Sequence, residues 1–195
     1  MEKFYKMGTD DLNFKRLEYS QDTEWETILC PKFKGHQRNG NRIGELKIST
    51  VAYNSNDFLW TFLDWMLNEK VVDIFMKYKI TGYNLEPIRI LESGSSSNIY
   101  ELVVNGQGGK ADSRSGIIVK ESCEYCGMKI YSAFENGIWI NETNWDGSEI
   151  FTIEGYPSYY MVNERLKEII LKHKLTGVNL ICTQDLKWNP FFYKP

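Results

Sequence analysis

The chain has 195 residues, of which 42% are hydrophobic and 14% aromatic, and this composition is that of a folded protein with a core, not of a disordered chain. Its mild net charge of −3 argues against nucleic acid or an anionic membrane as the main partner. No apolar run approaches the ~18 residues of a membrane span, and the N-terminus lacks the apolar segment of a secretory signal. We therefore expect a cytoplasmic protein whose four cysteines are reduced or metal-bound.

The N-terminal part of the chain alternates short apolar runs with polar, turn-rich stretches. Residues Met1–Met7 favour a first strand, and the polar segment Asp10–Glu26 favours an irregular loop. A basic, turn-rich stretch follows Cys30, and Ile43–Val51 favours another strand. This part therefore predicts a β-rich beginning with few helical signals.

A 19-residue stretch then occurs twice, at a constant offset of 95. Residues 67–85 read LNEKVVDIFMKYKITGYNL, residues 162–180 read VNERLKEIILKHKLTGVNL, and nine positions are identical. Asn68 and Asn163 are good helix N-caps, apolar residues recur at helical spacing, and a Thr-Gly pair ends each helix before a strand-like run. Each copy predicts a capped helix, a glycine turn and a strand.

The segment between the two copies is rich in strand and turn signals. Apolar runs at 99–104 and 117–120 flank Asn105–Gly116, which holds four glycines and predicts the mobile tip of a hairpin. Met128–Phe134 and Gly137–Asn141 favour two further strands. Together with the repeat, these elements predict an α+β fold with two related helix-turn-strand units, antiparallel β-sheet and a zinc-knuckle-like CxxCG connection. We divide the chain into an N-terminal half, 1–98, and a C-terminal half, 99–195, which could form one compact domain.

The sharpest chemical motif is Cys123-Glu-Tyr-Cys126-Gly127. Two thiolates at this spacing can occupy two corners of a zinc tetrahedron, with the glycine allowing the tight turn beneath the metal. A redox pair is a second interpretation, although it usually needs a helix N-terminus to lower a thiol pKa, and the following residues favour a strand. The third is a pair of small buried residues at a hairpin, because a strong zinc signal needs a second pair of ligands.

Cys30 offers a partial second pair. Cys30-Pro31 opens like another knuckle, but Phe33 stands where its second cysteine is expected, and His36 follows. Since zinc accepts mixed thiolate and imidazole ligands, Cys30, His36, Cys123 and Cys126 are the candidate metal ligands. The alternative is a decayed site, filled by packing around Phe33. The fourth cysteine, Cys182, lies in the second repeat and is expected in the core.

Catalytic signals are weak. The chain has two histidines, and His173 lies on the apolar face of the second predicted helix, where a packed core histidine is the simpler interpretation. No glycine-rich phosphate loop carries the Walker lysine or the dinucleotide spacing. The acids Asp146, Glu149 and Glu154 fit solvated or turn positions better than a general acid–base pair. We therefore predict a protein that is not an enzyme and has no catalytic residues.

Several motifs taken in order resemble a known family. They are Cys30-Pro31, Gly35-His36 and Arg42-Ile43-Gly44; Cys123-Glu-Tyr-Cys126-Gly127; Trp145-Asp146-Gly147-Ser148; and Leu175-Thr176-Gly177. This pattern resembles the bacterial double-CxxCG-motif proteins, which include immunity proteins of polymorphic toxin systems. The first CxxCG is degenerate in this chain, because Phe33 replaces its second cysteine. The resemblance implies a cytoplasmic protein that neutralises a cognate toxin without catalysis.

Two classes of function follow. The first is an immunity protein that binds a cognate protein toxin, with Asn105–Gly116 and the aromatic tail Trp188–Tyr193 as candidate contact segments. The second is a small zinc-ribbon-type adaptor, for nucleic acid or another partner, which the basic residues between Lys32 and Arg42 would favour. The acidic net charge weighs against the nucleic-acid partner.

Overall fold

The computed structural model describes residues 2–9, 17–50, 56–61, 63–92 and 98–187. In these ranges the strands are β1 (Phe4–Gly8), β2 (Glu24–Ile28), β3 (Arg38–Ile43), β4 (Leu46–Thr50), β5 (Phe58–Trp60), β6 (Trp65–Asn68), β7 (Tyr83–Glu92), β8 (Ile99–Val104), β9 (Val119–Ser122), β10 (Lys129–Tyr131), β11 (Ile150–Ile153), β12 (Tyr156–Asn163) and β13 (Asn179–Cys182). The helices are α1 (Glu69–Tyr78) and α2 (Glu164–Lys172). The predicted aromatic tail Trp188–Tyr193 lies outside the described residues.

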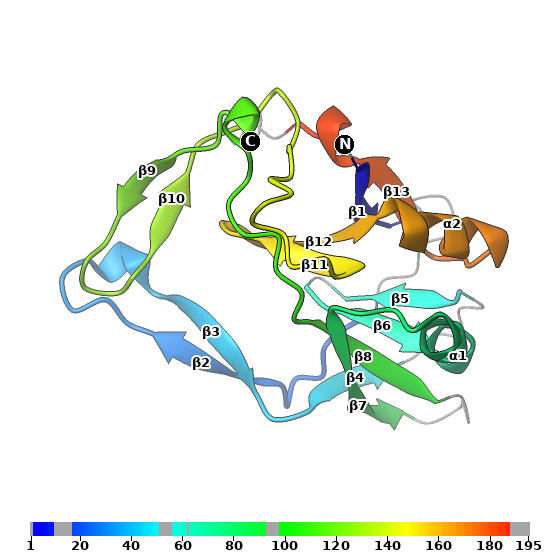
Figure 1. Cartoon of the computed structure of the whole chain (residues 1–195). Helices are drawn as coiled ribbons and strands as arrows, with labels where there is room; N and C mark the ends of the chain where they lie inside the picture. Colours follow the sequence, from blue (N-terminus) through cyan, green and yellow to red (C-terminus); the bar gives the residue numbers. More distant parts are fainter. Residues whose placement is uncertain (1, 10–16, 51–55, 62, 93–97, 188–195) are drawn as a thin grey trace.

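The strands form two larger sheets and two separate hairpins (Figure 1). One sheet has the order β11-β12-β1-β13, and the other has the order β4-β7-β8-β6-β5. The two-stranded pairs β2-β3 and β9-β10 extend to one side of these sheets, so that the whole arrangement curls like an open half-barrel (Figure 1). One helix follows β6 and the other follows β12.

The predicted α+β class is wrong, because the protein is mostly β. Of the described residues, 41% lie in strands and 17% in helical segments, and only two α-helices are present among them. The predicted N-caps are present, since the side chains of Asn68 and Asn163 accept from the backbone N–H of Val71 and Leu166. However, the repeats do not form self-contained helix-turn-strand units: β13 pairs with β1, from the opposite end of the chain. The predicted arrangement, in which a CxxCG connection joins two such units, is wrong as well, because the CxxCG motif lies in the loop of the β9-β10 hairpin, separate from both larger sheets.

The two sheets nevertheless share one pairing pattern at the offset of the repeat. In one sheet β8 lies between β6 and β7, and in the other β1 lies between β12 and β13. The registers agree residue by residue: Ile99 with Asn68 and Phe4 with Asn163, then Tyr100 with Pro87 and Tyr5 with Cys182. Every number in the second set differs from its counterpart by 95. The N-terminal strand therefore occupies, in the second sheet, the place that β8 holds in the first.

The two copies of the repeat pack against the opposite sheet through equivalent contacts. The φ angles of Gly82 and Gly177 are +90° and +85°, and a Cβ on either would lie about 2 Å from a carbonyl oxygen of the other half. Beside these glycines the same bonds occur twice: Thr81 donates to Glu149, and Thr176 donates to Asp57. Around them a single core joins both sheets and both helices, with buried residues such as Phe58, Phe75, Leu67, Ile150, Val162, Leu166 and Ile169.

The segment Asn105–Gly116 is not the mobile hairpin tip that its glycines predicted. It packs along β11, with Gly108 N–H donating to Thr152 O at 2.8 Å and Glu154 N–H donating to Gly109 O at 2.8 Å. Glycine is needed here for close approach, because a Cβ on Gly106 would lie 2.1 Å from a carbonyl oxygen of β11. The predicted strand Gly137–Asn141 is also absent; this segment has no regular structure, and Ile138 and Ile140 are buried in a second core cluster.

Candidate metal centre

The four candidate ligands lie in the loops of the two separate hairpins. Cys30 and His36 come from the connection between β2 and β3, and Cys123 and Cys126 come from the connection between β9 and β10. Every side chain within these four strands is half-buried or exposed. Two-stranded hairpins without an apolar core are marginal on their own. Their loops therefore need another source of order.

The CxxCG loop is held by its own backbone. Cys123 N–H donates to Met128 O at 2.8 Å, and Gly127 N–H donates to Cys123 O at 2.9 Å. The φ angle of Gly127 is +66°, in the left-handed region that glycine enters without a steric penalty. This turn brings the two thiols to the same side of the loop, as the spacing of a zinc knuckle requires.

The other loop brings a histidine to the place of the missing cysteine. Phe33 N–H points at the Cys30 thiol at 3.3 Å, and a short 3-10 turn over Lys34–His36 then reverses the chain. The His36 ring stacks at a tilt against Phe33, with ring centroids 5.0 Å apart. Phe33 itself is 52% exposed, so it does not fill a decayed site with apolar packing.

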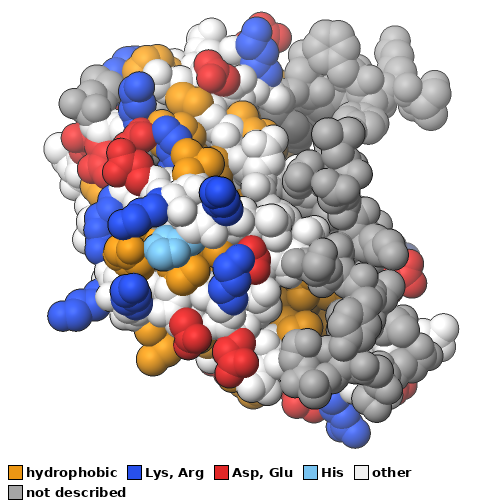
Figure 2. Space-filling view, turned by 90° about the vertical axis from the view of Figure 1, so that its right-hand side faces the viewer, with side chains coloured by type: hydrophobic (Ala, Val, Ile, Leu, Met, Phe, Trp, Pro, Cys, Tyr) orange, Lys and Arg blue, Asp and Glu red, His pale blue; other side chains and the backbone are white. Residues whose placement is uncertain are grey.

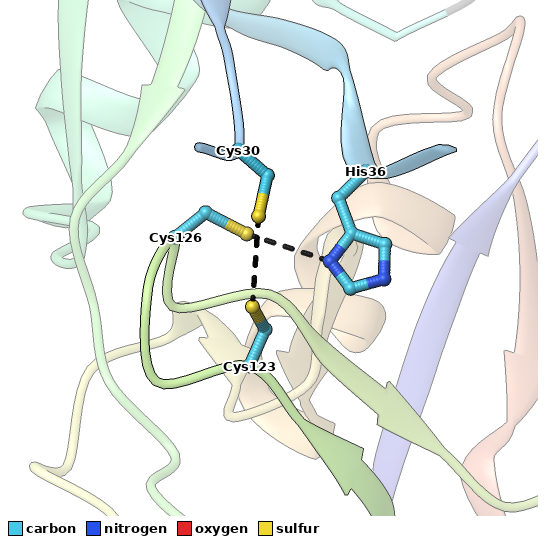
Figure 3. A group of neighbouring side chains, drawn as sticks. All are labelled: Cys30, His36, Cys123 and Cys126. Carbon is cyan, nitrogen blue, oxygen red and sulfur yellow. Dashed lines mark hydrogen bonds between the residues drawn. The ribbon is translucent and has the colours of Figure 1, made fainter. Parts of the chain in front are cut away.

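The four side chains converge on one point (Figure 3). The Sγ atoms of Cys30 and Cys123 are 3.8 Å apart, and Cys126 Sγ is 3.7 Å from His36 Nδ1. A tetrahedral zinc with Zn–S of ~2.3 Å and Zn–N of ~2.0–2.1 Å has S···S edges of about 3.8 Å and S···N edges of about 3.6 Å. All four ligand atoms lie within 4.8 Å of one another. The arrangement thus has the size and donor chemistry of a metal site.

The surroundings of Cys126 favour its thiolate form. The backbone N–H of Met128, with Arg38 and His36, lowers the pKa of the Cys126 thiol to about 6, whereas burial raises the pKa of Cys123. Thiolate is the form that binds metal, and with this pKa Cys126 is mostly a thiolate at neutral pH. Arg38 also donates to Cys126 O at 3.0 Å. With three thiolates and one divalent ion the site keeps one net negative charge, which the Arg38 guanidinium offsets.

Two arginines in this region were missed by motif reasoning, which treated Lys32, Lys34, Arg38 and Arg42 as one basic cluster. Arg38 belongs to the Cys126 loop, as described above. The Arg42 guanidinium turns inward and forms ion pairs with Asp64 at 3.3 Å and Glu101 at 2.5 Å. These pairs tie the base of the β2-β3 hairpin to the five-stranded sheet. No motif in the sequence indicates either pairing.

The remaining sequence candidates have structural partners. His173 Nε2 lies 3.0 Å from the Tyr78 hydroxyl, and Cys182 packs against the main core. Asp146 accepts from Ser148 and Gln107, and Glu149 and Glu154 each pair with a cation. No model of a known protein family matches the chain, and no curated protein matches it. Neither helix in the described part of the chain has the length and apolar character that a membrane crossing requires.

Proposed function

We propose that Cys30, His36, Cys123 and Cys126 bind one structural Zn²⁺, and that the protein is a cytoplasmic, non-catalytic immunity protein that binds and neutralises a cognate toxin. The closed set of three thiols and one imidazole carries the metal part of this proposal. Four protein donors fill a zinc tetrahedron and leave no position for a substrate or a reactive water. Such an ion supplies folding free energy rather than chemistry.

A structural role also suits the surroundings of the site. The two hairpins share no strand pairing, and their strands contribute no buried side chain. A metal bound by both loops would serve as the core of this part of the molecule. The nearby Lys32 and Tyr125, whose ammonium and ring lie 5.6 Å apart, would then be displayed on a fixed surface.

The toxin-binding part rests on the resemblance to double-CxxCG proteins. The order of the CxxCG, Trp-Asp-Gly-Ser and Leu-Thr-Gly motifs supports it. The engagement of both histidines, His36 with Cys126 and His173 with Tyr78, agrees with a role in binding rather than catalysis. A neutralising protein needs a specific surface and a stable scaffold, not a reactive group.

The nucleic-acid adaptor is the weaker alternative. Its support was the basic cluster between Lys32 and Arg42. Two of those four cations are engaged within the protein, because Arg38 bonds to the Cys126 loop and Arg42 forms ion pairs with carboxylates. Two remaining lysines on an acidic protein are a small footprint for a phosphate backbone.

The metal is tested by elemental analysis of protein purified without added metal. We expect about one zinc per chain, and loss of that zinc in a Cys126→Ser variant. Cys182→Ser is the matched control, since Cys182 packs against the core and should leave the zinc content unchanged. A wild-type protein without metal would refute the zinc proposal.

The toxin-neutralising role is tested by co-expression with the C-terminal domain of the protein encoded by the adjacent reading frame. That domain alone should kill the host, and co-expression with this chain should restore growth and yield a complex on purification. Equal killing with and without this chain would refute the role, whatever the metal content.

A further inference from the structure

The C-terminal ends of the two helices contact each other through residues that the repeat makes equivalent. Tyr78, at the end of α1, and His173, just after α2, occupy equivalent positions, 95 residues apart. The Tyr78 hydroxyl lies 3.0 Å from His173 Nε2, and the two rings pack edge to face with centroids 5.4 Å apart. Cations from both copies meet at this pair, because Lys77 and Lys172 both lie over the Tyr78 ring.

Four lysines surround the pair: Lys77 and Lys79 from one copy, and Lys172 and Lys174 from the other. All four are exposed. Among the ion pairs of the described residues, none involves any of them. Other cations of the same helices do have carboxylate partners: Lys70 with Asp57, Arg165 with Glu149, and Lys167 with Glu164. Lys77 Nζ and Lys172 Nζ lie 5.9 Å and 5.7 Å from the centroid of the Tyr78 ring, a contact that leaves their charge in place. The four lysines thus carry positive charge that no ion pair within the described residues offsets.

Two of these lysines have an unfavourable backbone conformation. Lys79 has a φ of +53° and Lys174 has a φ of +50°, and they are the non-glycine residues with positive φ in the described part of the chain. Glycine is the usual residue at this point of a helix end, because a Cβ destabilises the left-handed conformation. The two copies differ at ten of 19 positions, yet both keep lysine here. The helix dipole favours a cation near each C-terminus, but Lys77 and Lys172 already supply one in the last turn, so the dipole does not require a second lysine in the left-handed position.

An exposed apolar side chain accompanies each pair of lysines. Met76 is 67% exposed and Leu171 is 62% exposed, and these positions are again 95 residues apart. Figure 2 views the side of the molecule that carries both helices, and basic side chains are spread there around hydrophobic ones. The acids Asp73 and Glu168 lie four residues before Lys77 and Lys172 on the same helices, but no ion pair joins either acid to its lysine. We call the six residues Met76, Lys77, Lys79, Leu171, Lys172 and Lys174 the axis face.

We propose that the axis face is the docking surface for an acidic surface of the partner toxin. This inference rests on the proposed function and names the chemistry of its partner. Four exposed lysines that form no ion pair within the described residues complement carboxylates on another protein, and electrostatic complementarity of this kind raises association rates and selects partners. The exposed Met76 and Leu171 favour a protein partner over nucleic acid, because they can enter apolar depressions that a phosphate backbone lacks.

The test uses a Lys79→Gly/Lys174→Gly variant, because a docking role and a folding role predict different results. Glycine relieves the left-handed conformation, so the Tm of the variant should rise by a few degrees. Its Kd for the toxin domain of the adjacent reading frame should nevertheless rise by about tenfold, with a weaker salt dependence. Lys34→Gln/Lys120→Gln removes the same charge from the hairpins and should leave that Kd unchanged.

A second variant, Met76→Ala/Leu171→Ala, tests the apolar contacts and should also weaken binding to the toxin domain. Its stability should be nearly unchanged, because both side chains are exposed in the free protein. If wild-type protein forms the complex and both axis-face variants bind as tightly, the docking surface lies elsewhere, while the proposed function stands. If wild-type protein does not bind the toxin domain at all, the proposed function fails, and this inference fails with it.

Discussion

Loss of the metal is expected to separate the two hairpins and to lower the stability of the protein strongly. Cys30 and Cys123 are 93 residues apart in the chain, and their thiols meet at 3.8 Å. In the chain-entropy treatment, a crosslink that closes a loop of this length stabilises the folded state by about 4–5 kcal/mol. A chain of this size loses about 2–4 °C of Tm per kcal/mol. We therefore expect Cys126→Ser, or a chelator, to lower Tm by about 10–20 °C.

Removal of the metal should unfold the two hairpins before it affects the main core. The strands of the hairpins bury no side chain, whereas α1 and α2 each contribute several residues to the main core. Hydrogen exchange followed by mass spectrometry should show faster exchange in β2, β3, β9 and β10 after metal removal, with protection retained in the helices. Cys182→Ser serves as the control that keeps the site intact.

Two results would refute this reasoning. A Tm that is unchanged when metal is removed would mean that the hairpins hold each other without it. Uniform loss of protection, including α1 and α2, would mean that the hairpins and the main core unfold as one unit. Either outcome would contradict the role of the metal as a local crosslink between the two hairpins.

Three further predictions concern the main sheets. Gly82→Ala should lower the unfolding free energy in urea by more than about 2 kcal/mol, because its Cβ would lie 1.9 Å from a carbonyl oxygen of β11, whereas Gly44→Ala, at positive φ but in open space, should lose only about 1 kcal/mol. Arg42→Met should lower the unfolding free energy by about 3–5 kcal/mol, because it leaves the buried Glu101 carboxylate uncompensated. A second substitution, Glu101→Leu, should recover part of that loss if Arg42 and Glu101 are paired as described. Burial alone would raise the pKa of Asp57, but its lysine partner on α1 and the backbone N–H of the second repeat outweigh burial and hold that pKa below its usual value. A lowered carboxyl pKa stabilises the fold above the unfolded-state pKa, so wild-type protein should lose this stability as pH falls below about 4, and Asp57→Asn should show a flatter profile there; equal profiles would contradict the assignment.

Local features of this protein followed from the sequence. The Asn68 and Asn163 caps were predicted, because capping and helical periodicity depend on residues within one or two turns. The prediction that glycines 82 and 177 end the helices was wrong, because α1 ends at Tyr78 and α2 at Lys172, and the left-handed residues that follow them are Lys79 and Lys174. The grouping of Cys30, His36, Cys123 and Cys126 was also predicted, because few side chains can bind zinc and the chain has few of them.

The tertiary structure decided which strands pair, and with that the fold class. Short strands reveal which of their faces is apolar but not which strand lies beside them, so the pairing of β1 with β13, more than 170 residues away, was invisible. The same limit hid the packing of Asn105–Gly116 along β11 and the inward turn of Arg42. These contacts are long-range, and their partners carry no local signal because hydrogen bonds and ion pairs depend on positions in space, not on spacing in the chain.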